Sequence, residues 1–449
     1  MAERISRRHA LAVGASALAA GRVSTAAAAD WELEQPREGA RWREGSRQVI
    51  RWKRGASSEP IGEDVELLWS TDGGKTWQSI GRALAEAGRF LWTVPSGTGS
   101  ARVRVSSAGK ALAESRVRLG PSAEVPEYRW EKITMTAAFA PRDGAGALTY
   151  RDRMWFLGGW NPGIKKAFPR VCNNEVWSSA DGRDWTLEKP NTFLDKSFDP
   201  NTDWEGRHTA GYAVHRDKMW IVGGDVNQGH YHFDVWNSSD GKRWTQVNAG
   251  RPVPWGPRAL HYTVAFKDYL WVMGGQVVPQ FAPGPEGVRR DVWRSRDGVE
   301  WEEVPVREPA WSPRGMIGGS AVHKDRIWIL GGGTYDTPKM PERNYYNDVW
   351  SSADGSRWTR HLHESPWTAR QYHDVAVFDG RLWVTEGYAR ANRNDVWYSE
   401  DGENWYEVPN TPWKPRHAAS LYVHAGALWM VAGNNMEPDV WKLSRGTSK

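Results

Sequence analysis

The chain has 449 residues, of which 39% are apolar and 25% charged, a composition typical of globular proteins with more than one domain. Its formal net charge is +5, and the first 29 residues contribute +3 of it. The remaining +2 argues against nucleic-acid binding, which usually requires a clear basic excess. A single cysteine, Cys172, excludes an internal disulfide.

Residues 1–29 have the three parts of a cleavable signal peptide: a basic start, an apolar stretch and an alanine run before the cleavage site. Ser6-Arg7-Arg8 followed by Leu11 resembles the twin-arginine export signal, which carries folded proteins. An ordinary secretory signal with two incidental arginines is the alternative. Either signal predicts a periplasmic or secreted protein. After signal removal no apolar run is long enough to span a membrane, so no membrane contact is expected.

Residues 30–120 predict a β-sandwich. Short segments that alternate apolar and polar side chains are separated by glycine and proline, as at 48–52, 65–69, 89–94 and 101–105. Several such strands in ~90 residues favour two packed sheets. Residues 121–126, which begin and end with proline, are interpreted as a linker.

This segment resembles the immunoglobulin-like N-terminal domain of yeast cell-wall-synthesis and Ser/Thr-rich anchored proteins. The shared features are a glycine and proline pattern and three short motifs: Pro36, Gly39, Gly45, Ile50-Arg-Trp52, Ser70–Trp77 and Trp92–Pro95. The resemblance implies an Ig-like sandwich before residue 121.

Residues 127–449 contain six repeats with a spacing of 46–65 residues, a period that indicates a propeller. One unit is a tryptophan, two apolar residues and a Gly-Gly pair, and it begins at Trp155, Trp220, Trp271 and Trp328. It recurs in degraded form at Trp383 and Trp429. The other unit is acid-Val-Trp, with its acid at Glu175, Asp234, Asp291, Asp348, Asp395 and Asp439. Asp-Gly follows the first five of these units and predicts a tight hairpin.

Together these units resemble the kelch-repeat family. The resemblance implies an all-β fold: a six-bladed β-propeller over 127–449. The sixth repeat lacks a fourth strand, and residues 128–134 match the missing pattern. We therefore expect 128–134 to pair with 439–444 and close the last blade, which would remove an open sheet edge.

One face of such a propeller collects two sets of connections: those between the second and third strands of each blade, and those between successive blades. The former are long and unequal, which is typical of a binding face. The latter carry an aromatic-x-x-Arg pattern, with tryptophan in five repeats and phenylalanine in one. The candidate ligand-binding residues are Arg142, Arg207, Arg258, Arg314, Arg370, Arg416, Trp204, Trp255, Trp311, Trp367, Trp413, Tyr372 and His373.

Arginine suits carboxylates and aromatic rings stack on sugars, so this pattern predicts a binding module for an anionic or other glycan, or for a protein. The alternative is architectural: each arginine pairs with the repeated acid and each tryptophan fills the gap between blades. We expect a monomer without a cofactor.

Two enzymatic hypotheses stay open. Kelch propellers also occur in the copper-containing galactose-oxidase family, and Tyr372, His373, Cys172 and Tyr212 resemble part of its ligand set. The C-terminal domain that completes that site is not expected here, since the sequence ends at Lys449. A periplasmic sugar mutarotase or epimerase would need an acid and a base beside an arginine, for which Asp225, Glu386 and Glu437 are candidates. The histidines near the inner strands could bind a metal, but hydrogen bonding between blades is the stronger interpretation: His208, His261, His373 and His417.

Overall fold

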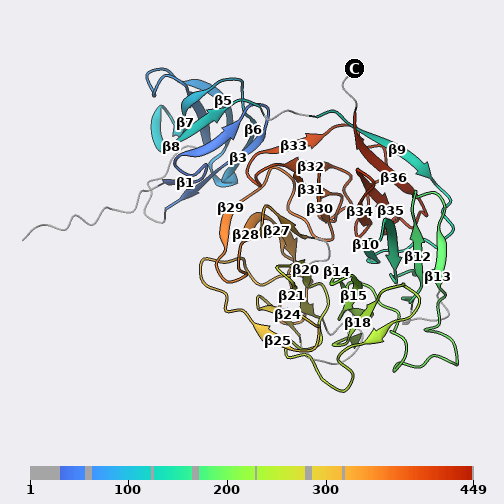
Figure 1. Cartoon of the computed structure of the whole chain (residues 1–449). Coiled ribbons are helices and arrows are strands. Elements are labelled where there is room, and N and C mark those ends of the chain that lie inside the picture. The colour runs from blue at the N-terminus through green and yellow to red at the C-terminus, as the bar shows by residue number, and fades with distance from the viewer. Residues whose placement is uncertain are drawn as a thin grey trace, which may run out of the picture.

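The computed structural model describes residues 31–55, 63–122, 126–163, 171–227, 230–278, 286–315 and 319–446 (Figure 1). The predicted signal peptide lies outside the described residues. Within them the chain is all-β, as predicted, with one short 3-10 helix, η1 (Ala85–Ala87), and no α-helix. No helix in this part of the chain has the length and apolar character needed to cross a bilayer.

The N-terminal region consists of two facing sheets. One contains β1 (Trp31–Gln35), β3 (Arg47–Arg54) and β6 (Arg89–Thr93). The other contains β2 (Ala40–Arg43), β8 (Lys110–Gly120), β7 (Gly99–Ser107), β4 (Asp64–Ser70) and β5 (Gln78–Leu84). Alternate side chains of both sheets form a shared core that includes Trp42, Trp52 and Trp69. The four strands predicted from the alternation are therefore present.

In the rest of the described chain, six antiparallel four-strand units follow one another. Sheet 1 is β10 (Gly146–Tyr150), β11 (Arg153–Leu157), β12 (Val176–Ser179) and β13 (Thr186–Lys189). Sheet 2 is β14 (Gly211–His215), β15 (Lys218–Val222), β18 (Val235–Ser238) and β19 (Thr245–Gln246). Sheet 3 is β20 (Tyr262–Phe266), β21 (Tyr269–Met273), β24 (Val292–Ser295) and β25 (Trp301–Glu303).

The remaining three units have the same order. Sheet 4 is β26 (Ser320–His323), β27 (Arg326–Gly333), β28 (Tyr345–Ser352) and β29 (Thr359–Leu362). Sheet 5 is β30 (Asp374–Phe378), β31 (Arg381–Thr385), β32 (Val396–Ser399) and β33 (Trp405–Val408). Sheet 6 is β34 (Ser420–His424), β35 (Ala427–Val431), β36 (Val440–Arg445) and β9 (Tyr128–Thr134). Two small hairpins lie between second and third strands: β16 (Asp225–Asn227) with β17 (His230–Tyr231), and β22 (Gln276–Val277) with β23 (Gly287–Val288).

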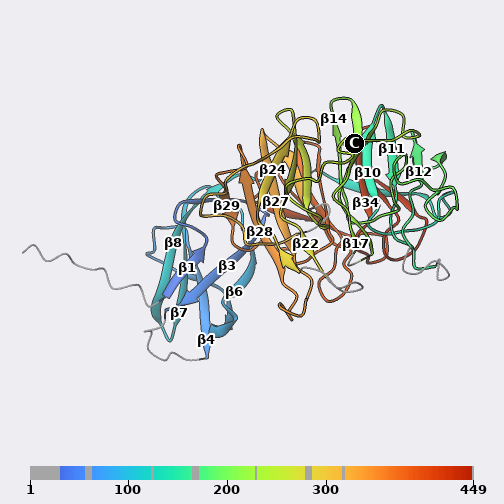
Figure 2. The ribbon, with the colours of Figure 1, turned by 90° about the horizontal axis from the view of Figure 1, so that it is seen from below.

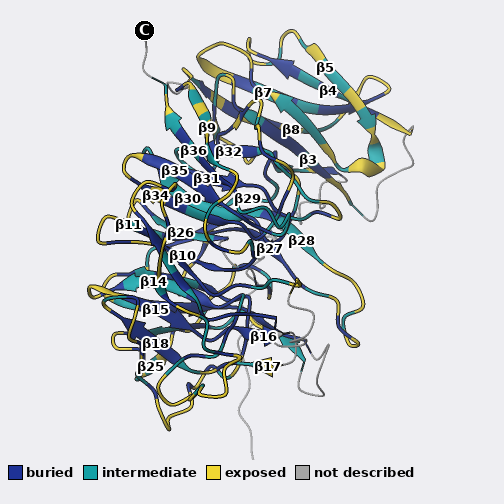
Figure 3. Ribbon diagram, turned by 90° about the vertical axis from the view of Figure 1, so that its right-hand side faces the viewer, coloured by how far each residue is buried: buried dark blue, intermediate teal, exposed yellow. Residues whose placement is uncertain are grey.

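The first strands of these units contact one another in cyclic order: β10, β14, β20, β26, β30, β34 and again β10. Figure 1 shows the sheets around a common centre, and Figure 2 shows the N-terminal strands to one side of them. Figure 3 shows that the strands of the sheets consist largely of buried and intermediate residues. This arrangement is consistent with a β-propeller. The predicted pairing at the closing edge is confirmed, since β9 pairs antiparallel with β36 from Thr134 opposite Val440 to Tyr128 opposite Arg445.

Each Asp-Gly turn packs against a tryptophan of the preceding sheet. In the turn at Asp240, the carboxylate accepts hydrogen bonds from the amides of Lys242 and Arg243. Gly241 has φ of 72°, and a β-carbon there would lie 2.1 Å from the Trp155 ring of sheet 1. The repeated glycine therefore serves both the turn and the close approach to the preceding sheet's tryptophan.

The N-terminal region docks on sheet 5. Strand β3 pairs with β33 at Arg47 opposite Trp405, which covers the outer edge of that sheet. The buried Asn404 side chain accepts hydrogen bonds from the Arg43 amide and the Gln48 side chain, at 2.9 and 3.0 Å. The contact is therefore a polar, hydrogen-bonded seam.

Candidate functional site

The six predicted arginines are buried, at most 2% exposed, and each pairs with the acid of its own repeat. The shortest N–O distance is 2.5–2.7 Å in five of the pairs. Each guanidinium also donates to the carbonyl of the first residue of the Gly-Gly pair, or of its degraded equivalent, as Arg207 does to Gly223 at 3.0 Å. The geometry of Arg142, Arg207, Arg258, Arg314, Arg370 and Arg416 is thus that of the architectural alternative.

The ion pair in sheet 2 shows the electrostatics of this repeat. Burial alone would raise the pKa of Asp234, but the Arg207 guanidinium holds it well below its usual value. The same carboxylate accepts the indole N–H of Trp236 at 2.7 Å. Asp234 is therefore ionised and fully engaged, and Arg207 has no free charge to offer a ligand.

The five predicted tryptophans lie in the core rather than on an open face. Each is at most 3% exposed and meets the tryptophan of the Asp-Gly hairpin edge-on, with centroids 5.7–6.0 Å apart in four cases: Trp204, Trp255, Trp311 and Trp367. Trp413 instead meets Trp130 of β9, at 5.8 Å. Trp130 takes the place of the hairpin tryptophan here because β9 is the fourth strand of sheet 6.

A cavity of about 590 Å³ opens where the two predicted sets of connections converge. We call it the mouth pocket, and its lining comes from both sets: Asp143, Gly144, Trp160, Pro162, His208, Thr209, Tyr335, Arg343, Tyr372, Tyr388, His417, Ala418, Asn434 and Met436. Of the predicted ligand-binding residues it includes Tyr372 alone. His373 is fully buried, with its Nε2 2.7 Å from the Leu330 carbonyl oxygen.

A backbone collar surrounds the base of this pocket. Four hydrogen bonds of 2.9–3.2 Å run from sheet to sheet through residues two positions after the repeated arginine: Gly144, Thr209, Leu260, Tyr372 and Ala418. All five have φ between 50° and 60°, the left-handed region that non-glycine residues rarely adopt. The collar holds Tyr372 in this conformation at the cavity wall.

Three interacting side chains, His208, Asp225 and Cys172, lie on one side of the pocket. His208 Nδ1 is 3.0 Å from the Asp225 carboxylate and 3.6 Å from the Cys172 sulfur. Burial opposes the imidazolium, but Asp225 raises the pKa of His208 well above its usual value. Thr209 donates to the same carboxylate at 2.6 Å. The pocket therefore contains a fixed cation backed by a buried carboxylate.

Asp143 supplies a proton donor or acceptor in the same pocket. It is 9% exposed, and burial raises its pKa to about 7. Its backbone forms a two-way bridge with Trp160, which holds both residues at the wall. Near neutral pH this carboxyl group is present in both protonation states, as acid–base catalysis requires.

The opposite wall is aromatic and carries a second cation. The hydroxyls of Tyr335 and Tyr372 are hydrogen-bonded to each other. The Arg343 guanidinium lies 4.6 Å from the Tyr335 ring centre and binds Asp336 at 2.6 Å. Its side chain is 37% exposed, unlike the repeated arginines. Burial lowers the pKa of His417 to about 4, so that ring is neutral.

A smaller cavity of about 170 Å³ lies beyond the collar, of which it shares Gly144 and Ala418. Asp374 lines it, and the neighbouring Glu386 accepts a hydrogen bond from the Asp374 amide at 3.1 Å. Burial raises the pKa of both carboxyls, and the neighbouring Asp374 raises the pKa of Glu386 further. The predicted acid Glu386 thus belongs to a buried carboxyl pair, whereas Glu437 forms an ion pair with Lys414.

The copper and histidine-metal hypotheses find no shared centre among the described residues. Cys172 donates to the Val226 carbonyl at 2.9 Å, whereas His373 is bound to a different sheet through Leu330. His261 lines the inner cavity, and His417 Nδ1 lies 2.8 Å from the Asn392 amide oxygen. The hydrogen-bonding interpretation fits His373 and His417, whereas neither ring nitrogen of His261 has a hydrogen-bond partner within the described residues.

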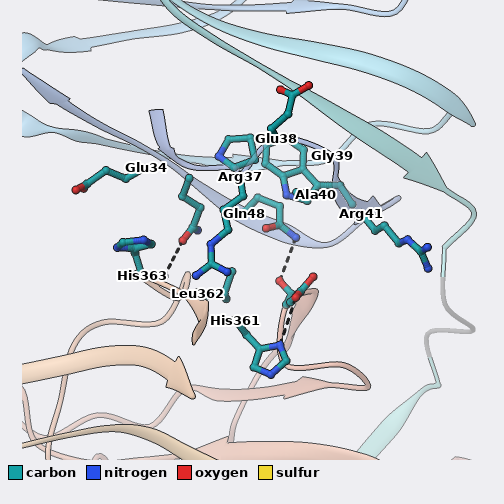
Figure 4. A pocket seen from close by; sticks show the side chains of 14 residues that line it. Glu34, Arg37, Glu38, Gly39, Ala40, Arg41, Gln48, His361, Leu362 and His363 are labelled. Atoms are coloured by element: carbon teal, nitrogen blue, oxygen red, sulfur yellow. Dashed lines mark hydrogen bonds and ion pairs between the residues drawn. The ribbon is translucent and has the colours of Figure 1, made fainter. Parts of the chain in front are cut away.

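Another cavity, of about 380 Å³, lies at the seam between the N-terminal region and sheets 4 and 5 (Figure 4). Gln35 binds the Glu364 carbonyl across it at 2.9 Å, and His361 pairs with Glu403 at 3.3 Å. Two of its acids pair with arginines outside the lining, Glu34 with Arg51 and Glu38 with Arg116. Because both parts of the chain line this cavity, we assign it to their docking.

The sequence analysis missed Asp143, Trp160, Tyr335 and Tyr388. Two of them occupy positions that a repeat alignment can flag. Asp143 directly follows a repeated arginine, and Trp160 directly follows a Gly-Gly pair. Both positions differ in type from repeat to repeat, unlike the architectural positions beside them.

No family model matches the sequence, and no curated protein sequence matches it either. Similar solved structures include one described as the structure of YjhT, which is 17% identical. The similarity covers 51% of this chain and 72% of that chain, with a TM-score of 0.41.

Proposed function

We propose that this protein is an exported six-bladed kelch-type propeller that binds an anionic glycan in the mouth pocket. The proposed parts are a signal peptide at 1–29, an Ig-like sandwich at 30–120, a linker at 121–126 and the propeller at 127–449. The six sheets are the blades, and β9 completes the last one. Its location is the periplasm or the medium.

The observation that most supports this proposal is the composition of the mouth pocket. Its volume of about 590 Å³ fits a small ligand or one or two sugar units. Trp160, Tyr372 and Tyr388 offer flat aromatic faces, which stack on sugar rings. Arg343 and the His208 imidazolium add two cations, which favour a ligand with a carboxylate.

Calorimetric titration tests this proposal, with D-glucuronate as the anionic probe and D-glucose as its neutral counterpart. We expect glucuronate to bind more tightly, and Arg343→Met to reduce that preference because one of the two recognising cations is lost. Arg390→Met is the matched control. Arg390 is exposed and does not line the pocket, although Tyr388 of the same connection does. Equal affinity for both sugars, or equal loss in both variants, would overturn the proposal.

A sugar mutarotase or epimerase is the second candidate, because Asp143 and His208 place a base and an acid in one pocket. In mutarotation the base removes the anomeric hydroxyl proton while the acid protonates the ring oxygen. The ring C–O bond then breaks, and reclosure on the other face returns both protons. NMR exchange between glucuronate anomers measures this reaction, and Asp143→Asn should abolish any acceleration while preserving binding.

A further inference from the structure

A cluster of potential metal ligands lies outside the mouth pocket and outside the smaller cavity beyond the collar. Glu205 comes from the connection into sheet 2, and His230 and His232 come from the β16–β17 hairpin and the residue after it. Glu205 Oε2 is 3.3 Å from His230 Nε2 and 3.5 Å from His232 Nε2. The three ligand atoms all lie within 4.8 Å of one another.

These separations are long for direct hydrogen bonds, of which only the one between His230 Nε2 and Glu205 Oε2 forms, at 3.3 Å. Good N–H···O bonds span about 2.7–3.2 Å between heavy atoms. Two ligand atoms at about 2.0–2.1 Å from a tetrahedral zinc ion are about 3.4 Å apart. The two carboxylate–imidazole distances therefore match edges of a zinc coordination tetrahedron.

His232 supplies an independent observation. The residue is 8% exposed, and its Nε2 has no hydrogen-bond partner within the described part of the chain. A buried polar atom without a partner calls for a ligand or an ion.

The repeat does not require these residues. The position of Glu205, directly after the aromatic residue of the aromatic-x-x-Arg pattern, has no acid in the other five repeats: Ala140, Gly256, Ser312, Thr368 and Lys414. The paired histidines also occur in this connection alone. A feature confined to one repeat is not explained by packing that all six share.

The backbone holds the cluster in place. Arg207 Nε donates to the Glu205 carbonyl at 3.0 Å, and the His232 amide donates to Gly224 at 2.8 Å. The Arg207 charge is itself neutralised by Asp234 at 2.5 Å. The exposed His230 ring lies against the His232 ring, with centroids 5.4 Å apart.

We propose that Glu205, His230 and His232 bind a first-row divalent transition-metal ion of the Zn²⁺ type. One carboxylate oxygen and two imidazole nitrogens would supply three ligands and leave the next position to water or an exogenous donor. This site is separate from the mouth pocket, and the proposal does not depend on the function of that pocket.

Calorimetry with Zn²⁺ on the untagged, metal-stripped full chain tests the proposal, and the visible absorption of bound Co²⁺ reports the coordination. We expect one stoichiometric site. Loss of even an outer-shell partner costs about 10- to 100-fold in metal affinity, so His232→Ala and Glu205→Gln should each weaken binding at least about 100-fold. His363→Ala removes a histidine outside the cluster and should leave binding unchanged.

Thermal unfolding in EDTA separates ligand loss from misfolding, because Glu205→Gln keeps the size of the side chain and should unfold at the same temperature as the wild type. Zn²⁺ should raise the unfolding temperature of the wild type and of His363→Ala, but not that of Glu205→Gln. Absence of binding to the wild type, or binding that His232→Ala and Glu205→Gln leave intact, would overturn the site.

Discussion

Buried charge is the recurring feature of individual residues in this protein. Arg416 and Asp439 show it most clearly, because both side chains are at most 1% exposed and they form two hydrogen bonds of 2.7 and 2.8 Å. The Trp441 indole donates to the same carboxylate at 2.7 Å. The arginine thus completes a local network that the repeat supplies in every sheet.

Arg416→Met should therefore be strongly destabilising. It leaves the Asp439 carboxylate buried without its counter-charge, and breaking such pairs typically costs about 3–5 kcal/mol. Urea denaturation followed by tryptophan fluorescence measures the loss. The control is Arg216→Met, which removes an exposed pair with Asp268 and should change little. Similar midpoints for the two variants would contradict the architectural role.

Asp143 predicts a pH dependence of ligand binding. Its pKa is raised to about 7, so the carboxyl is largely neutral below that pH and anionic above it. We expect glucuronate affinity, measured by calorimetry, to fall roughly tenfold from about pH 6 to about pH 8, because the ionised Asp143 carboxylate repels the carboxylate of the ligand. In Asp143→Asn this decrease should disappear. A wild-type decrease that persists in the variant would assign the titration to another group.

At the scale of elements, the closing strand brings together segments that are over 300 residues apart in the sequence. Strand β9 contributes Trp130 and Tyr128 to the hydrophobic cluster of sheets 5 and 6. The Tyr128 hydroxyl also donates to Asp379 at 2.7 Å. The strand therefore joins the sheet through its side chains as well as through its backbone.

A disulfide across this edge tests the closure. Glu131 lies directly opposite Lys442, so Glu131→Cys with Lys442→Cys should oxidise readily and raise the unfolding temperature. The closed loop is long, for which the entropic estimate is up to about 5 kcal/mol. Mass spectrometry detects the bond. Glu131→Cys with Ser444→Cys is the mismatched control, two positions out of register; equal oxidation of both pairs would contradict the register.

At the scale of the whole molecule, the N-terminal region is fixed to the ring of sheets by polar contacts. Asn404 is 2% exposed and, besides accepting from Arg43 and Gln48, donates to the Arg41 carbonyl at 3.1 Å. Glu364 binds Arg51 and Arg89 at 3.0 and 2.5 Å. These contacts fix the orientation of the N-terminal region relative to the sheets.

Asn404→Ala should loosen this seam, because it leaves several buried partners unsatisfied, each at a cost of about 1–3 kcal/mol. Hydrogen exchange measures the effect at the Arg43 amide, which donates to Asn404 at 2.9 Å. We expect faster exchange there than in Glu407→Ala, which removes a half-exposed pair with Arg47. Unchanged protection of that amide would show that the seam does not depend on Asn404.

The repeats allowed the sheets, the Asp-Gly turns, the closing strand and the face on which the long connections converge to be predicted from sequence. Hairpins are local, so their spacing survives in the chain, and Trp130 could be recognised as a displaced member of its series. Tertiary structure decided which charges remain available: it neutralised the repeated arginines and left Arg343 partly exposed. The sequence pattern offered this pairing only as one alternative, because the arginine and the acid of one repeat lie far apart along the chain and meet only when the sheet folds. The exposure of Arg343 depends on how the connections pack, which local spacing does not determine.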